Sequence, residues 1–196
     1  MMINPYLFTT AVTSSTWNPA DKSANIVLSN SNLTATITTN TNSQGVRGTT
    51  SKSSGKWYFE VLVGVAGFSG VQIGVANSSA STSTTIGADT NGFSYDSASG
   101  KKFTNNVLTT YGSAFTNGDV VGVALDMDSG SIWFAKNNVW QASGDPVAGT
   151  GQAFSGIAGS IFPATSLKSG PTANDTARFS TANQTYAPPS GFTAWG

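Results

Sequence analysis

"GDVVGVALDMDSGSIWFAKNN" spans residues 118–138 and decides the fold class. Apolar and polar side chains alternate along 119–128, the pattern breaks at Asp128-Ser129-Gly130, and alternation resumes along 131–137. A period of two is typical of a half-buried β-strand, and an Asp-Ser-Gly break between two such runs is typical of a turn. The stretch therefore predicts a β-hairpin.

Alternation also assigns the side chains of this hairpin to two faces. Gly122 and Ala124 share a face with Trp133 across the ladder, and their small size leaves room for its ring, so we expect Trp133 to pack there. The opposite face is large and apolar, and we expect it in the core: Val121, Val123, Leu125, Met127, Ile132 and Phe134.

The same period of two recurs along the chain, whereas helical spacing does not. Both faces of 55–63 are apolar, which is typical of a strand covered on both sides. Further strands are expected at 25–30, 32–38, 70–76, 92–96, 101–105, 161–167 and 176–180, and core aromatic rings at Trp57, Phe59, Phe134 and Phe179. About ten short strands in one chain predict an all-β fold, arranged as a two-sheet antiparallel β-sandwich.

Composition excludes several kinds of chemistry. The chain has no cysteine and no histidine, Glu60 is its single glutamate, and nine basic residues balance nine acidic ones. We therefore expect no thiol or histidine catalysis, no metal, no cofactor and no nucleic-acid binding, which needs a basic surface. No apolar run approaches the roughly 20 residues of a membrane helix, and "MMINPYLFTTAV" does not read as a secretory signal.

An ordered series of motifs from about Asn25 to Trp195 resembles the SPRY domain family. The turn after Lys136 is Asn137-Asn138 where the family usually has Asn-Gly, and asparagine also tolerates positive φ. The motifs are GKWYFEV at 55–61, IGVA at 73–76, GDVVGVALD at 118–126 with its return GSIWFAKNN at 130–138, IFPA at 161–164 and YAPPSGFTAW at 186–195.

The resemblance implies a bent sandwich, related to concanavalin-like lectins, that binds partners through loops at one rim and is not an enzyme. The insertion VWQASGDPVAGTGQAFSG at 139–156 is similar to the bacterial and bacteriophage branch of the family. We therefore expect a structural or binding protein of a bacteriophage virion, in a tail fibre or as a tail or capsid decoration. It would be made in the host cytoplasm, be present in several copies or as a homo-oligomer, and contact other virion proteins and a host-surface glycan or protein.

The segment "MMINPYLFTTAVTSSTWNPA" precedes the motifs that resemble the family. We expect the sandwich to span 21–196 and residues 1–20 to form either an arm or an extra edge strand. An arm would dock on this sandwich or on a neighbouring subunit through Tyr6, Phe8 and Trp17, because exposed apolar segments mark association.

Long loops are the expected places for ligand contact. Loops 77–91 and 137–156 and their flanks supply the candidate ligand-binding residues, which are Trp140, Gln141, Asp145, Tyr95, Tyr111 and Asp89. A carbohydrate-binding, lectin-like function, with Trp140 against a sugar ring, is the alternative to protein recognition.

Two carboxylates, Asp126 and Asp128, lie two apart on one predicted strand, about 6.5–7 Å between Cα atoms. That spacing overlaps the carboxylate separations of glycoside hydrolases, which are about 5–5.5 Å for retention and about 6.5–9.5 Å for inversion, so a hydrolase is a further alternative. However, Asp128 begins the hairpin turn and Asp126 matches a structural aspartate of the resembled family. We interpret both as hairpin residues, and we interpret Asp89 as part of an Asx turn and not a calcium ligand.

Overall fold

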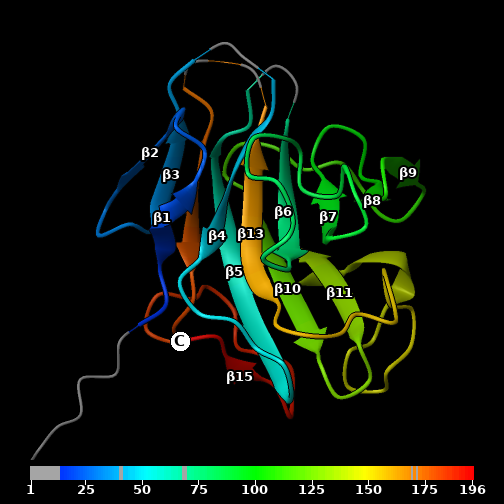
Figure 1. The fold of residues 1–196 in the computed structure, drawn as a ribbon. Coiled ribbons are helices and arrows are strands. Elements are labelled where there is room, and N and C mark those ends of the chain that lie inside the picture. Colours follow the sequence, from blue (N-terminus) through cyan, green and yellow to red (C-terminus); the bar gives the residue numbers. More distant parts are fainter. Residues whose placement is uncertain (1–13, 40–41, 68–69, 169, 171) are drawn as a thin grey trace, which may run out of the picture.

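The computed structural model describes residues 14–39, 42–67, 70–168, 170 and 172–196. Two sheets pack face to face, which confirms the predicted β-sandwich (Figure 1). The first sheet has seven strands, in the order β1 (Trp17–Lys22), β4 (Gln44–Gly48), β13 (Phe162–Leu167), β6 (Val71–Ala76), β7 (Gly92–Asp96), β8 (Lys102–Thr104) and β9 (Val107–Thr109).

The second sheet has eight strands. Seven follow the order β12 (Val139–Trp140), β11 (Ser131–Lys136), β10 (Val120–Asp126), β5 (Lys56–Val65), β14 (Asn174–Arg178), β3 (Thr34–Ile37) and β2 (Ile26–Ser29). The eighth, β15 (Thr193–Ala194), runs parallel to β5, whereas the other pairs are antiparallel. Apart from the 3-10 turn η1 (Gln141–Ser143), the described residues form no helix, so none there could span a membrane.

The hairpin predicted from 118–138 is present as β10 and β11. Val123 pairs with Phe134 and Ala124 pairs with Trp133, as alternation requires. The six side chains expected on the inner face all belong to the main core. At the end of β11, Asn137 and Asn138 both adopt positive φ, 47° and 65°, and turn the chain directly into β12.

Trp133 lies on the outer face of the second sheet, buried beside Ala124, Tyr58 and Phe192. One detail of the prediction was wrong. A Cβ on Gly122 would lie 2.7 Å from the Tyr58 hydroxyl oxygen, so the space above Gly122 holds the Tyr58 ring and not Trp133. Position 122 of β10 needs glycine because the Tyr58 ring of β5 lies on the same face of the sheet and fills the space that a side chain at position 122 would take.

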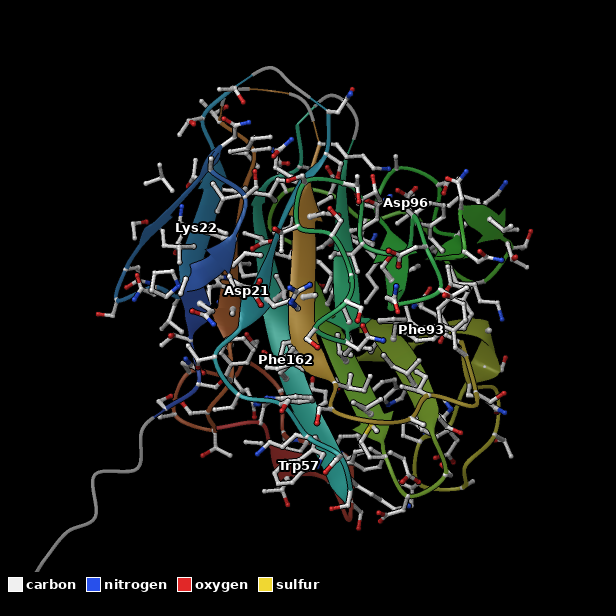
Figure 2. All side chains as sticks on the ribbon, viewed as in Figure 1. Asp21, Lys22, Trp57, Phe93, Asp96 and Phe162 are labelled. Atoms are coloured by element: carbon white, nitrogen blue, oxygen red, sulfur yellow. The ribbon has the colours of Figure 1, made fainter. Side chains whose placement is uncertain are left out.

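Aromatic rings fill the centre of the sandwich. Phe59, Phe134 and Phe179 are fully buried, as predicted. Trp57 is only half-buried and lies near the lower end of β5 (Figure 2), where Lys52 Nζ sits 3.5 Å from the centre of its ring. Trp57 is the second residue of β5, and its ring packs against the main core beside Trp195, at 6.4 Å between ring centres, without being enclosed by it.

The residues before 21 include an edge strand. β1 begins at Trp17 and pairs with β4, so the boundary expected at residue 20 falls inside this strand. The Trp17 ring is fully buried and packs edge-on against Phe179 at 5.3 Å, so Trp17 is a core residue and is not free to anchor an arm on another subunit. Tyr6 and Phe8 lie outside the described residues.

Candidate functional site

Asp126 and Asp128 stabilise the hairpin turn. Asp126 Oδ1 accepts hydrogen bonds from the backbone N–H groups of Asp128 and Ser129, and its Oδ2 lies 3.0 Å from Lys56 Nζ. Asp128 Oδ1 accepts a bond of 2.7 Å from the Gly55 N–H. Burial raises the pKa of Asp126, but the bonds from Lys56, Ser129 and Asp128 outweigh it and hold the pKa below its usual value. A glycosidase acid needs a raised pKa, so this pair does not suit that chemistry.

Loop 77–91 lies against the outer face of the first sheet. Ala80 and Ile86 are buried there, and Arg47 donates to the Ala80 carbonyl while forming a two-pronged pair with Asp21. Asp89 Oδ1 accepts a bond of 2.8 Å from the Asn91 N–H, which is the expected Asx turn. Loop 77–91 therefore packs over part of the outer face of the first sheet.

Two of the candidate residues, Tyr95 and Tyr111, are buried in the main core. The Tyr95 ring stacks on Phe134 at 5.6 Å between ring centres, and the Tyr111 hydroxyl accepts a bond from the Phe134 N–H. Burial raises the pKa of Tyr111 to about 12. Alternation along β7 puts Tyr95 on the inner face, so neither ring offers a surface to a ligand.

Gln141 is also buried, and it joins three segments of the chain. Its Oε1 accepts bonds from the Ser113 N–H at 2.9 Å and the Tyr95 hydroxyl at 3.3 Å, and its Nε2 donates to the Val139 carbonyl at 2.7 Å. The side chain has its hydrogen-bonding groups turned into the fold, so its role is to hold the loop after β12 in place.

Trp140 and Asp145 remain at the surface. Trp140 is half-buried, and its ring meets Tyr58 edge-on with 6.4 Å between ring centres. Asp145 is exposed and its Oδ1 caps a turn by accepting from the N–H groups of Val147 and Ala148. Because Gln141 points inward, the three residues predicted from this loop do not converge on one sugar-sized site.

Exposed apolar side chains gather on the side of the sandwich that carries β9 and β12. Of the five large apolar residues that are exposed among the described residues, Val107, Leu108, Val139 and Val147 lie in β9, in β12 or in the loop after β12. They are 45–65% exposed. The fifth, Val27, is 52% exposed in β2, at the opposite edge of the second sheet. We call the first four side chains the β9/β12 surface.

Both strands of this surface end their sheets. β9 pairs only with β8 and β12 only with β11, so each leaves one backbone edge without a neighbouring strand among the described residues. β9 and β11 lie on the same side of the molecule, opposite β1 and β2 (Figure 1). The prediction placed no strand at either position, because "VLT" and "VW" follow asparagine pairs but are too short to show a period.

Hydrogen bonds and ring contacts brace this side. Lys102 donates to the Ala153 carbonyl, Lys136 donates to the Ala114 carbonyl, and Phe93 packs on Phe154 at 5.4 Å (Phe93 is labelled in Figure 2). Asp145 is the only charged residue of β9, β12 and 141–151. The β9/β12 surface is therefore neutral, apolar and tied to both sheets.

The described ranges contain no group of three or more histidine, cysteine, aspartate or glutamate residues that could hold a metal ion. A cavity of about 400 Å³ opens between the loops at the upper end of the sandwich, lined by 65–67, 116–117, Gly170 and Thr172, none of them charged.

The sequence and the fold match known proteins. The family model described as SPRY domain matches residues 56–184. The chain is 30% identical over 125 residues to the dual specificity protein kinase splA of Dictyostelium discoideum, which is 61% of this chain and 5% of that protein. It is 36% identical over 93 residues to the ATP-dependent RNA helicase DDX1 of Xenopus laevis, which is 47% of this chain and 12% of that protein.

The chain thus spans a small part of the length of these relatives. Among solved structures, the SPRY domain of human HERC1 superimposes with a TM-score of 0.68 at 17% identity, covering 87% of this chain and 99% of that one. At this identity the superposition establishes the fold alone.

Proposed function

Because the chain belongs to the SPRY domain family, we propose that it is a non-catalytic protein-binding module whose partner contacts the β9/β12 surface. SPRY domains are protein interaction modules, and the proposal assigns that role to one side of this sandwich. The kinase and helicase activities in the names of the relatives belong to proteins of which this chain matches only a small part.

The observation that carries the proposal is the distribution of exposed apolar side chains. Four of five lie on one side, and burying such side chains against a partner removes apolar area from water at about 25 cal/mol per Å². Contiguous exposed apolar surface marks interaction sites, and a free strand edge offers backbone donors and acceptors to an extended segment. A partner with a neutral, apolar strand or loop therefore fits this surface.

Site-specific photo-crosslinking tests the proposal. Benzoylphenylalanine at position 139 or 108 is expected to capture a protein partner, whereas the same probe at position 27 is expected to capture little. Val27 is the matched control because it is a valine on an edge strand at the far side, and its exposure of 52% lies between those of Leu108 and Val139. Equal capture from position 27 would refute the choice of surface.

The virion placement is the finer part of the proposal. Its support is the near-neutral surface, the absence of cysteine and histidine, and the long insertion at 139–156. The relatives reported above are from Dictyostelium and Xenopus, and they add no support to it. Mass spectrometry of purified particles tests it: the protein is expected at several copies per particle, and its absence from them would remove the virion role and leave the binding role standing.

A further inference from the structure

Asp175 is a fully buried carboxyl group at the centre of the sandwich. On β14 it pairs with Val63 of β5 and Ala35 of β3, both inner-face residues of the second sheet. Thr165 lies on the inner face of the first sheet, between Val46 and Ile73. The Thr165 hydroxyl and Asp175 Oδ2 are hydrogen-bonded, so this pair is a polar contact between the two sheets.

The pair has too few protons for its acceptors if the carboxyl is ionised. The Thr165 hydroxyl carries one hydrogen, yet both Asp175 Oδ2 and the Gln72 carbonyl, at 3.2 Å, lie within its reach. Asp175 Oδ1 has no hydrogen-bond partner. A neutral carboxyl supplies the second proton, because its Oδ2–H donates to the Thr165 oxygen while Thr165 donates to the Gln72 carbonyl. Oδ1 lacks a donor in either form, but only an ionised carboxyl places negative charge on this unpartnered oxygen.

No charged side chain faces Asp175 from the strands around it. β3, β6 and β13 contain no titratable residue. Side chains alternate between the two faces of a strand. Val61 and Val63 of β5 point inward, so Lys56 and Glu60 point outward. Asp175 and Ala177 of β14 point inward, so Arg178 points outward. Arg47 of β4 points outward to Asp21.

We propose that Asp175 is a pH-sensitive contact between the two sheets: in its neutral form it donates to Thr165 and holds the sheets together, and on ionisation it becomes a buried charge that faces no cation from the surrounding strands, which loosens them. Burial raises the pKa of Asp175 to about 7, and the bond from Thr165 offsets only part of this rise. The ionisation of Asp175 and the loosening of the two sheets are therefore expected near neutral pH. Neither depends on the β9/β12 surface.

The sign of the effect follows from proton linkage. The unfolded chain loses the proton of Asp175 near its ordinary pKa of 3.8, whereas the folded chain keeps it until about pH 7. The contribution of Asp175 to stability is complete below pH 3.8 and is lost as the pH rises through the folded value. Across that interval, the equilibrium constant for unfolding is expected to rise by up to about tenfold per pH unit from this group alone.

Urea unfolding from pH 4 to pH 8 tests the proposal on the wild type, Asp175→Asn and the control Asp145→Asn, which removes an exposed carboxyl. Asp175→Asn keeps a donor for Thr165 and cannot ionise, so its unfolding constant is expected to lack the rise between pH 4 and pH 7 and to lie below the wild-type value at pH 8. Parallel curves for the wild type and Asp175→Asn would overturn the proposal.

A direct titration keeps the test independent of the variant's folding. Carbon-13 NMR of the wild-type carboxyl groups is expected to show one aspartate that titrates near pH 7. A spectrum in which every aspartate titrates below pH 5 would overturn the proposal. Amide hydrogen exchange in β13 and β14, corrected for the intrinsic effect of pH, is expected to accelerate at least tenfold from pH 5 to pH 8, and unchanged protection would contradict the loosening.

Discussion

Gln141 Oε1 accepts a hydrogen bond of 2.9 Å from the Ser113 N–H, and this bond ties the loop after β12 to the loop before β10. The same side chain reaches Tyr95 in the core and the Val139 carbonyl in β12. The Gln141 amide thus connects β12, the strand of the second sheet that carries Val139, to Tyr95 of the first sheet and to the loop before β10. Because these bonds hold β12 in place, a partner that binds the β9/β12 surface would have less conformational entropy to remove from the chain.

Replacing Gln141 by alanine is expected to destabilise the fold by about 1–3 kcal/mol, because its hydrogen bonds with the Ser113 N–H and the Val139 carbonyl, worth about 0.5–1.5 kcal/mol each, are lost. Urea unfolding measures this difference. Amide exchange at Ser113 is expected to rise in the same variant, whereas Gln152→Ala, at an exposed glutamine of the same loop, is expected to change neither quantity. A stable Gln141→Ala variant with a protected Ser113 amide would show that the brace is dispensable.

Glu60 holds the C-terminal segment against β5. It is fully buried, and its two oxygens accept from the Tyr58 hydroxyl and from the N–H groups of Thr185 and Tyr186. Glu60→Gln places an amide N–H₂ group where one of these oxygens accepted, so we expect a loss of about 1–3 kcal/mol and faster amide exchange at 185 and 186. Unchanged exchange at both amides would argue against this attachment.

Gly122 is expected to reject even one methyl group, because a Cβ would lie 2.7 Å from the Tyr58 hydroxyl oxygen. Gly122→Ala is therefore expected to cost about 1–3 kcal/mol as Tyr58 moves away from Glu60. A double-mutant cycle provides the check. In a Tyr58→Phe background the cost is expected to fall, because the clashing oxygen is gone, and equal costs in both backgrounds would point to another cause.

Asp126 is expected to stabilise the fold at neutral pH and to lose that effect in acid. Its folded pKa lies below the ordinary value, so its contribution is present above pH 3.8 and disappears as the pH falls through the folded value. Asp126→Asn is therefore expected to be less stable than the wild type at pH 7, and this difference is expected to be smaller at pH 2.5. Urea midpoints at the two pH values measure this, and a constant difference would contradict the linkage.

The sandwich could be predicted because alternation and turn residues are local signals. The hairpin at 118–138 needed only its own sequence, and the ten predicted strands are all present, the strand at 92–96 with the predicted ends and the other nine with shifted ends. β4, "QGVRG", was missed because its outward Arg47 is covered by loop 77–91, and no local pattern reports such a cover. β9, β12 and β15 have only two or three residues each, which is too few to show a period, and β1 contains Asn18 and Pro19, which are uncommon inside strands.

The candidate site was less accessible to prediction for a physical reason. Trp140, Gln141 and Asp145 are close in sequence, but the directions of the first two side chains depend on segments more than 25 residues away, Tyr58 for Trp140 and Ser113 for Gln141. Asp145 instead caps its own turn. Tyr95 is the exception, since Phe93 and Tyr95 alternate along one predicted strand and could have been assigned to the inner face.

The most direct test of the proposed function is the affinity of the purified partner for three forms of the chain: the wild type, Leu108→Asp/Val139→Asp and Val27→Asp. Isothermal titration calorimetry is expected to show at least tenfold weaker binding, about 1.4 kcal/mol, for the double variant and less than twofold change for Val27→Asp. Equal affinities for the wild type and the double variant, or a loss confined to Val27→Asp, would contradict the assignment of the β9/β12 surface as the binding site.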